Sequence, residues 1–248
     1  MANKLKTTLI YLSLVFSIVS IFLISSISNG IITMYSSMLK SDGDIIITQA
    51  KISDTFFSNV NINLIEQINN IKGVLESTAL IVGASPVEKL PIVAVYGASS
   101  NRFKNYELIS GNYPNKNEVI VGKSIYEQLT NKNEIQIANK SFKISGVFKS
   151  EIGFENGGVI LPITHAAEIF NKSASIIMVN TNLNSNLESV IKEIKKLDTQ
   201  IDAKTTQNFV DNYNQFKIIK TSSNIISLIA FCMGLLGITS LMSITINQ

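Results

Sequence analysis

The uncharged stretch TTLIYLSLVFSIVSIFLISSIS, from Thr7 to Ser28, decides the fold class of this protein. A helix that crosses the hydrocarbon core of a bilayer needs about 20 mainly apolar residues, and this stretch supplies them. The uncharged sequence continues as far as Leu39, which is longer than the hydrocarbon core requires. We therefore expect a membrane helix over residues 7–39 whose last part extends beyond the membrane as a stalk, with Tyr35 near the interface.

A cleaved signal peptide is the alternative interpretation of the same stretch, and Lys4 and Lys6 would form its basic segment. A signal peptide, however, has an apolar segment of only about 7–15 residues, followed by small residues at a cleavage site. Here the apolar run is longer, and Ser26-Ile27-Ser28 resembles such a site only weakly. The sequence therefore favours an uncleaved anchor.

The C-terminal sequence TSSNIISLIAFCMGLLGITSLMSITINQ, from Thr221 to Gln248, is a second uncharged stretch. It is also long enough to cross a bilayer, so we expect a second membrane helix over residues 221–248. Ala230 and Gly234 have a spacing of small residues that lets helices pack closely in lipid. The general abundance of Gly and Ala in membrane helices explains the pair equally well. Cys232 lies mid-span, where we expect it to act as a small apolar side chain.

The charges beside these two stretches predict an orientation in the membrane. Residues 1–6 contain Lys4 and Lys6, which place the N-terminus in the cytoplasm by the positive-inside rule. The segment between the helices then lies outside the cytoplasm, and the C-terminus returns inside. Lys217 and Lys220 precede the second helix on its outer side and mildly oppose this assignment.

The charged residues are concentrated between the two helices. All 18 acidic residues and all but two of the 21 basic residues lie between Lys40 and Lys220. The 16 % charge of the whole chain is low for a soluble domain, which carries about 25 %, and this argues against a soluble enzyme. Arg102 is the only arginine, and no basic cluster with interleaved aromatic residues is present. Arginine is the residue best suited to phosphate and base contacts, so we expect no nucleic-acid partner.

Hydrophobic periodicity between the helices predicts an α+β domain over residues 40–204. Runs of β-branched residues predict strands at 44–48, 77–82 (closed by Gly83, Ser85 and Pro86), 91–96 (ended by Gly97), 115–122, 159–162 and 175–180, and a hairpin at 135–148 that turns at Asn139-Lys140. Apolar residues three and four apart predict helices at 64–71, 123–129, 164–170 (capped by Thr164) and 187–197. The segment Ser110-Gly111-Asn112-Tyr113-Pro114 has the composition of a turn.

Residues 205–220 carry a further apolar stripe formed by Phe209, Tyr213, Phe216 and Ile219. These side chains recur at intervals of three and four residues, which indicates a helix. No Gly or Pro separates the stripe from the second uncharged stretch. We therefore expect one long helix that begins outside the membrane as a stalk, over residues 205–220, and then enters the membrane.

No motif in the sequence indicates a catalytic, cofactor-binding or metal site. Gly122-Lys123-Ser124 imitates the end of a P-loop, but Asn117 occupies the place of the first glycine and a strand is expected between them. His165 is the only histidine, and one histidine cannot form a zinc site. A Ser-His-Asp triad also lacks its G-x-S-x-G elbow, so we expect His165 at the surface in the first turn of a helix.

An acidic loop is the remaining candidate among the polar segments. Glu151 and Glu155 lie among Gly153, Gly157 and Gly158. This composition is typical of a mobile, solvated connection. We therefore expect both carboxylates to be in water and assign them no chemical role.

Three segments of the middle region share their pattern with a known family. Residues 111–122, GNYPNKNEVIVG, are similar to its "G-x-x-P…E-V-V-V-G" segment, residues 142–147 to its "F-x-V-x-G-V" strand, and residues 159–162 to its "V-x-x-P" element, which precedes a short helix. Their order, placed between two spans, resembles the first half of the MacB/FtsX-like ABC transporter permeases. The resemblance covers essentially the whole chain.

This resemblance implies a fold and a function. The expected fold is α+β: two membrane helices flanking an extracytoplasmic α/β domain of two lobes on a helical stalk, in the bacterial inner membrane. The expected function is that of a permease subunit, not an enzyme, which couples ATP hydrolysis by a partner ATPase to movement of its periplasmic domain. ATP would be bound by that partner, and this chain would bind no cofactor. The further implied partners are membrane lipid, a second permease copy or paralogue, a periplasmic adaptor and an outer-membrane channel.

The family's pattern continues past the second span into a charged coupling segment and two more spans, whereas this sequence stops at Gln248. A truncated product, a split gene and an N-terminal fragment of a permease are the three explanations that we weigh. A two-span membrane sensor with an extracytoplasmic ligand-binding domain is the alternative function, and a membrane-anchored adhesion or scaffold domain is a third. The β-rich motifs favour the permease. The sequence does not identify its substrate.

Overall fold

A computed structural model describes residues 2–150 and 153–246 of the chain. The chain divides into two compact units, which are described separately: Ser37–Asp211 form the sheet unit, and Met1–Ser36 with Asn212–Gln248 form the helical unit. Glu151 lies outside the described residues, and so do the side chains of Lys4 and Lys6, on which the predicted orientation depends.

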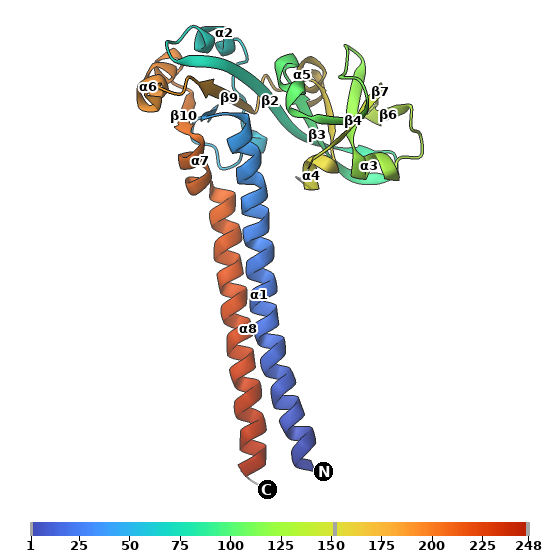
Figure 1. The fold of residues 1–248 in the computed structure, drawn as a ribbon, viewed down its shortest axis with the longest axis vertical. Helices are drawn as coiled ribbons and strands as arrows, with labels where there is room; N and C mark the ends of the chain where they lie inside the picture. The colour runs from blue at the N-terminus through green and yellow to red at the C-terminus, as the bar shows by residue number, and fades with distance from the viewer. Residues whose placement is uncertain (1, 151–152, 247–248) are drawn as a thin grey trace. The chain divides into compact units, whose positions relative to one another are not determined.

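The sheet unit is built on one mixed sheet (Figure 1). Its strands are β1 (Ile45–Gln49), β2 (Val74–Val87), β3 (Leu90–Ala98), β4 (Glu107–Gly111), β5 (Glu118–Gly122), β6 (Glu134–Ile137), β7 (Lys140–Lys149), β8 (Val159–Pro162), β9 (Ile176–Thr181) and β10 (Ile201–Thr205). They are arranged in the order β10-β1-β9-β2-β3-β8-β5-β7-β4, and β6 pairs with β7. The β3–β8 and β5–β7 pairs are parallel, and the other pairs are antiparallel.

The helices of the sheet unit lie in the connections between its strands. They are α2 (Leu64–Asn69), α3 (Lys123–Gln128), α4 (Gly153–Asn156), α5 (Ile163–Phe170), α6 (Leu187–Leu197) and α7 (Thr206–Asn212), together with the 3₁₀ turns η1 (Thr55–Phe57) and η2 (Ser100–Asn105). The helix of 187–197 has the bounds that its periodicity predicts, because its apolar side chains, such as Val190 and Ile194, are buried against the sheet.

Two hydrophobic cores divide the sheet unit into two lobes. The first lobe packs α2 and α6 on β1, β9, β10 and the first half of β2. The second lobe packs α3 and α5 on β3, β5, β6, β7, β8 and the end of β2. Strand β2 belongs to both lobes, since Ala79 is buried in the first core and Ile81 in the second. The two lobes therefore share a continuous strand and not a flexible linker.

Strand β2 is longer than the sequence predicts. The expected end at Gly83, Ser85 and Pro86 is wrong, because Gly83 and Ser85 pair with Val95 and Val93 of β3. Gly83 serves close packing here, since a Cβ at this position would collide with the ring of Phe170. Strand β3 likewise continues through Gly97 to Ala98, and Gly97 lies against Ala166 of α5. These glycines mark where α5 approaches the sheet, not where the strands end.

Three local details also differ from the expectations. Ser110 and Gly111, expected in a turn, end strand β4 and pair with β7. The hairpin between β6 and β7 turns at Ala138 and Asn139, whose φ values of 45° and 66° are those of a tight hairpin turn. Thr164 lies inside α5 and does not cap it; the N-cap position is Pro162, which has no side-chain oxygen to offer.

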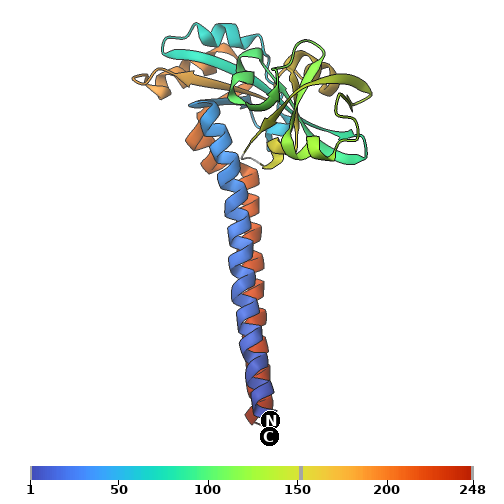
Figure 2. The same ribbon diagram turned by 45° about the vertical axis from the view of Figure 1, so that its right-hand side comes forward.

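The helical unit contains two long helices that lie side by side, α8 (Asn214–Ile246) and the part of α1 (Ala2–Asp42) that ends at Ser36 (Figures 1 and 2). Their segments Thr8–Ser37 and Asn214–Ser240, with mean hydropathy 2.4 and 1.7, are long and apolar enough to cross a membrane by length and composition. Helix α1 remains uninterrupted through Tyr35, as the uncharged continuation predicts. Cys232 is exposed on α8.

The expected single helix from residue 205 onward is wrong. Thr205 ends β10, α7 follows it, and α8 begins only after Tyr213. The interruption between α7 and α8 contains no Gly or Pro. It contains Tyr213, whose ring stacks on that of Tyr35 at a centroid distance of 5.9 Å and meets the ring of Phe216 edge-on at 5.1 Å. Pairing of Thr205 in the sheet and packing of Tyr213 therefore outweigh the helical periodicity of the stripe.

Small residues lie at the contact between α1 and α8. Gly234 is buried there, and a Cβ on it would lie 2.8 Å from the Cβ of Ser17. A Cβ on Gly237 would lie 3.5 Å from the Oγ of Ser13. Gly234, one of the predicted pair of small residues, thus permits the close approach of the two helices.

We predict that Gly234→Leu pushes α1 and α8 apart. In a Cys232→Ser background, cysteines at Ser13 and Gly237 should form a disulfide readily, and Gly234→Leu should reduce its yield strongly. The matched control is Gly30→Leu, since a Cβ on Gly30 meets no atom within 4 Å. Gel mobility under non-reducing conditions measures the yield, and equal losses in both variants would contradict the packing.

Candidate functional site

The segments that carry the family pattern lie on neighbouring strands of the second lobe. Gly111 of β4 is opposite Gly146 of β7. Gly111 has a φ of 80°, which disfavours side chains, and a Cβ on Gly146 would lie 2.7 Å from the carbonyl oxygen of Asn112. These glycines permit a close contact between two strands, so the family pattern here describes the fold and not a binding site.

The Gly122-Lys123-Ser124 segment also serves the fold. Strand β5 precedes it, as predicted, and α3 follows. The Oγ of Ser124 accepts a hydrogen bond of 2.7 Å from Asn156 Nδ2, and a Cβ on Gly122 would collide with the backbone of Asn156. This segment therefore holds α3 against α4.

His165 lies in the first turn of α5, as predicted, but it is half-buried. Its Nε2 contacts the carbonyl oxygen of Lys116, and its ring meets Phe142 edge-on at 5.4 Å. These contacts join α5 to β7 and to the segment that precedes β5. Within residues 2–150 and 153–246, no group of three or more His, Cys, Asp or Glu side chains could hold a metal ion.

The residues that follow α1 meet the end of β10 and the start of α7 at one point, which we call the joint and which consists of residues 43–44 and 205–206. Thr206 donates hydrogen bonds from its Oγ1 to the carbonyl of Gly43 at 2.6 Å and from its N–H to the carbonyl of Asp44 at 2.8 Å. The Asp44 carboxylate accepts bonds of 2.8 and 2.7 Å from the N–H and Oγ1 of Thr181. The two residues that directly follow α1 are therefore bonded to the first residue of α7, and Asp44 also to strand β9.

A buried charge cluster adjoins the joint. It consists of Asp42, Arg102, Tyr106 and Glu155, and we call it the Arg102 cluster. The Arg102 side chain is 1 % exposed; its Nη2 donates to the Asp42 carboxylate and its Nη1 to the Tyr106 hydroxyl. Asn105 Nδ2 donates a second hydrogen bond to Asp42, at 3.1 Å. The last residue of α1 is thus held by an ion pair inside the sheet unit.

Glu155 brings a second carboxylate to this cluster. The expectation that it is solvated is wrong: Glu155 lies in α4, is 5 % exposed, and accepts a hydrogen bond of 2.9 Å from Ser150 Oγ. Burial raises the pKa of the Glu155 carboxyl group, and the charge of Arg102 offsets part of this effect. Helix α4 turns inward because it packs on α3 and β5, and sequence composition does not reveal that contact.

Arg102 and Tyr106 keep fixed protonation states in the cluster. Burial would lower the pKa of the Arg102 guanidinium, but Tyr106 and the two carboxylates outweigh it and raise this pKa. Burial raises the pKa of the Tyr106 phenol, and Arg102 offsets part of the rise. The guanidinium therefore stays charged and the phenol stays neutral.

Sequence reasoning missed the Arg102 cluster, although one signal was present. The chain uses lysine for all its basic residues except Arg102. Arginine is better suited than lysine to a buried ion pair, because its planar guanidinium offers five donors and is weakly hydrated. A single arginine in a lysine-rich chain therefore indicates a buried structural position.

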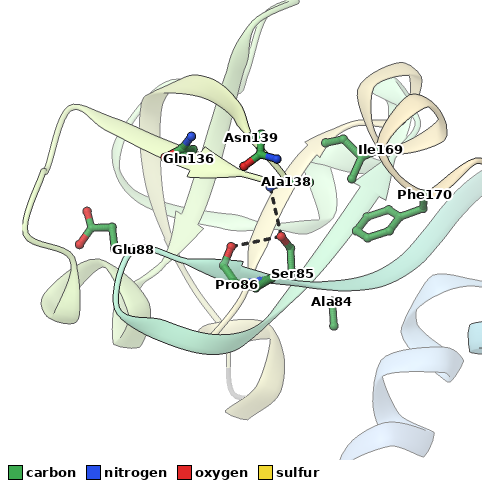
Figure 3. A pocket seen from close by; sticks show the side chains of 9 residues that line it. All are labelled: Ala84, Ser85, Pro86, Glu88, Gln136, Ala138, Asn139, Ile169 and Phe170. Carbon is green, nitrogen blue, oxygen red and sulfur yellow. Dashed lines mark hydrogen bonds between the residues drawn. The ribbon is translucent and has the colours of Figure 1, made fainter.

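An open pocket of about 530 Å³ lies in the second lobe (Figure 3). It is bounded by the end of β2, the turn after β6 and the end of α5, and is lined by Ala84, Ser85, Pro86, Glu88, Gln136, Ala138, Asn139, Ile169 and Phe170. The Ser85 hydroxyl accepts a bond from the Ala138 N–H at 3.2 Å and donates to the Pro86 carbonyl at 3.1 Å. The Glu88 carboxylate accepts bonds from two backbone N–H groups, at Thr130 and Asn131, which lower its pKa. These two polar side chains already have partners in the fold.

The architecture defines a class of protein: a mixed α+β sheet domain between two helices that are long and apolar enough to cross a membrane. Within this class, the chain belongs to the family of the MacB-like periplasmic core domain, whose model matches residues 7–197. The sequence resemblance and the α+β fold are therefore confirmed.

Solved structures with low sequence identity share this fold. The periplasmic region of MacB from Actinobacillus actinomycetemcomitans has a TM-score of 0.56 and 12 % identity, and the match covers 68 % of this chain and 93 % of that one. The extracellular domain of the noncanonic ABC-type transporter YknZ from Gram-positive bacteria has a TM-score of 0.54 and 14 % identity, with 65 % and 99 % covered. No curated protein matches the chain.

We predict that Arg102→Met strongly destabilises the sheet unit, because Asp42 is then buried without its cation. The free energy of unfolding should fall by about 3–5 kcal/mol, and the double variant Asp42→Asn/Arg102→Met should recover part of this loss. Denaturant unfolding of the full chain in detergent measures both. The control is Lys104→Met, which removes an exposed pair with Glu76 and should change stability by about 0–1 kcal/mol. Equal losses for Arg102→Met and Lys104→Met would contradict the assignment.

We also predict that Glu155 makes stability depend on pH. Its pKa is raised above the ordinary value of 4.5 in the folded protein, so the folded state keeps a proton that the unfolded chain has lost. Its stabilising contribution is therefore present below pH 4.5 and is lost as pH rises through the folded pKa. The Glu155→Gln variant should have the same stability as the wild type in acid. Toward neutral pH it should become more stable than the wild type, because it has no carboxyl group to ionise. Thermal unfolding across this range measures the difference, and a constant difference would refute the prediction.

Proposed function

We propose that this chain is a permease subunit, or the N-terminal part of one, of an ABC-type export transporter, in which ATP hydrolysis by a partner ATPase moves the sheet unit. The family match over residues 7–197 and the two helices of membrane-spanning length support the permease. We assign ATP binding to the partner and no catalysis to this chain. The P-loop-like Gly122–Ser124 segment supports this, because it packs α3 on α4.

The joint is the observation that carries the mechanical part of the proposal. Only Gly43 and Asp44 separate the end of α1 from β1, and α7 begins directly after β10. Strands β1 and β10 are paired in register from Ile45↔Thr205 to Gln49↔Ile201. A displacement of the end of α1 or of the start of α7 would therefore reach the same pair of strands without passing through a flexible connection. Coupling by rigid helices requires such a direct connection.

The proposed setting is the bacterial inner membrane, with the N-terminus in the cytoplasm and the sheet unit in the periplasm or outside the cell. Exposed apolar side chains on both long helices, such as Phe16, Phe22 and Leu236, support contact with lipid. A second permease copy or paralogue, a periplasmic adaptor and an outer-membrane channel complete the proposed assembly, by analogy with the family.

A two-span sensor with an extracytoplasmic ligand-binding domain is the second candidate function. The open pocket in the second lobe favours it, because a mixed polar and apolar pocket of this size can hold a small ligand. The family match favours the permease over the sensor.

We predict that the full-length gene product co-purifies from its own cells with an ABC ATPase that carries a true P-loop, and that a flexible Gly-Ser-Gly insertion after Asn212 abolishes ATP-dependent export. The insertion lies at the junction of α7 and α8, so it should leave both lobes folded while it interrupts the connection. The matched control is the same insertion after the fully exposed Leu183, which should leave export intact. Co-purification of a signalling kinase, or export that survives the first insertion, would contradict the proposal.

A further inference from the structure

Arg102 stands between carboxylates that come from different parts of the sheet unit. Asp42 ends α1 and directly precedes the joint with the first lobe, whereas Glu155 lies in α4 of the second lobe. The turn η2 that carries Arg102 is fixed to β2, because Asn101 Nδ2 donates bonds of 2.9 and 3.1 Å to Glu76 Oε1 and to the Ser77 carbonyl. The guanidinium is thus anchored at the strand that both lobes share.

The guanidinium also has an unused donor. Its two Nη atoms bind Asp42 and Tyr106, but within the described part of the chain its buried Nε–H has no acceptor. Buried donors in proteins are rarely left without a partner, and such a case needs an explanation. The Glu155 carboxylate is close enough to interact electrostatically with Arg102, and its Oε2 is bound to Ser150 Oγ.

We propose that the Arg102 cluster is a two-position link between the end of α1 and the second lobe, set by the proton on Glu155. In the first position Glu155 is protonated, and Arg102 is held by Asp42 and Tyr106, the two contacts that this structure shows. When Glu155 releases its proton to solvent, its carboxylate moves to the unused Nε–H, and the guanidinium bridges Asp42 and Glu155.

The charges that surround this proton are few and defined. Asp42 comes from α1, Arg102 from η2, Tyr106 from the residue that directly follows η2, and Glu155 from α4. One guanidinium can neutralise one carboxylate, so a second ionised carboxylate adds a net negative charge to a buried site. That imbalance draws α4 toward η2, because closer contact with the guanidinium is the available compensation. The link therefore changes the spacing between the end of α1 and the second lobe.

This inference deepens the proposed function, and only its consequence for transport rests on that function. Since Asp42 is followed directly by the joint, a movement of α1 would reach the first lobe through β1 and the second lobe through Arg102. The protonation state of Glu155 would then set how strongly the movement of the second lobe is coupled to that of α1. Acidity outside the membrane would thereby regulate the movement.

The test measures distances in the full chain in nanodiscs, with Cys232→Ser as background. Spin labels at Lys40 and Glu127 report the spacing between the end of α1 and the second lobe, and labels at Lys40 and Lys192 report its spacing to the first lobe. Pulsed electron resonance should show that the Lys40–Glu127 distance distribution shifts as pH rises from 4.5 toward neutral, while the Lys40–Lys192 distribution stays constant. Glu155→Gln should abolish this shift and keep the acid distribution at every pH.

A second variant tests the role of Arg102. Arg102→Met should broaden the Lys40–Glu127 distribution at every pH, and if it does not fold, Asp42→Asn/Arg102→Met takes its place because that variant buries no unpaired charge at residue 42. A Lys40–Glu127 distribution that is constant with pH, or that shifts equally in Glu155→Gln, overturns the proposal. These distances need no ATPase, so their failure leaves the transporter proposal standing, whereas absence of an ATPase partner contradicts only the latter.

Discussion

The antiparallel pairing of β1 with β10 is the constraint on which the rest of the sheet unit depends. It joins Ile45 to Thr205, residues separated by almost the whole domain, and so closes the chain on itself. In the sheet order, β9 and β2 lie between this pair and the second lobe. The first lobe is therefore complete only when β10, the last strand in the sequence, is paired. The same pairing puts the end of α1 and the beginning of α7 side by side at the joint. The strands attached to these two helices are therefore hydrogen-bonded to each other along their whole length.

The Arg102 cluster places a different constraint on the same region. A buried ion pair seldom adds net stability, because desolvating both charges offsets their attraction. In other proteins, replacing such a pair with apolar residues of similar volume is often neutral or stabilising. What the charges provide is a defined geometry at the end of α1 and sensitivity to the protonation of Glu155. The position of this cluster at the end of α1 agrees with the mechanical coupling that we propose for the sheet unit.

Much of the fold follows from local pattern. The helix at 187–197 and strands such as β1 and β5 form where periodicity and β-branched runs predict them. In each of them, the spacing of the apolar residues already defines the face that is buried. The errors share one cause. Gly83 and Gly97 were predicted to end strands, but they lie inside strands where α5 approaches closely. Thr205 and Tyr213 were predicted within one helix, but strand pairing and aromatic stacking assign them otherwise. Each case depends on a partner distant in sequence, which a local window does not contain.

The sequence by itself determined how the chain divides into two apolar helices and a charged middle domain. Residues 7–39 and the residues after Lys220 carry no charge, and the free energy of transfer from water to lipid depends on composition alone. It also determined the family, through glycines and prolines whose spacing reflects backbone geometry. Only the tertiary structure decided which polar groups are buried together. Asp42, Arg102 and Glu155 are far apart in the chain, and nothing in their local sequence distinguishes them from solvated charges. Burial and pairing are properties of the packed domain, because the energy of a charge depends on the groups around it and not on its neighbours in sequence.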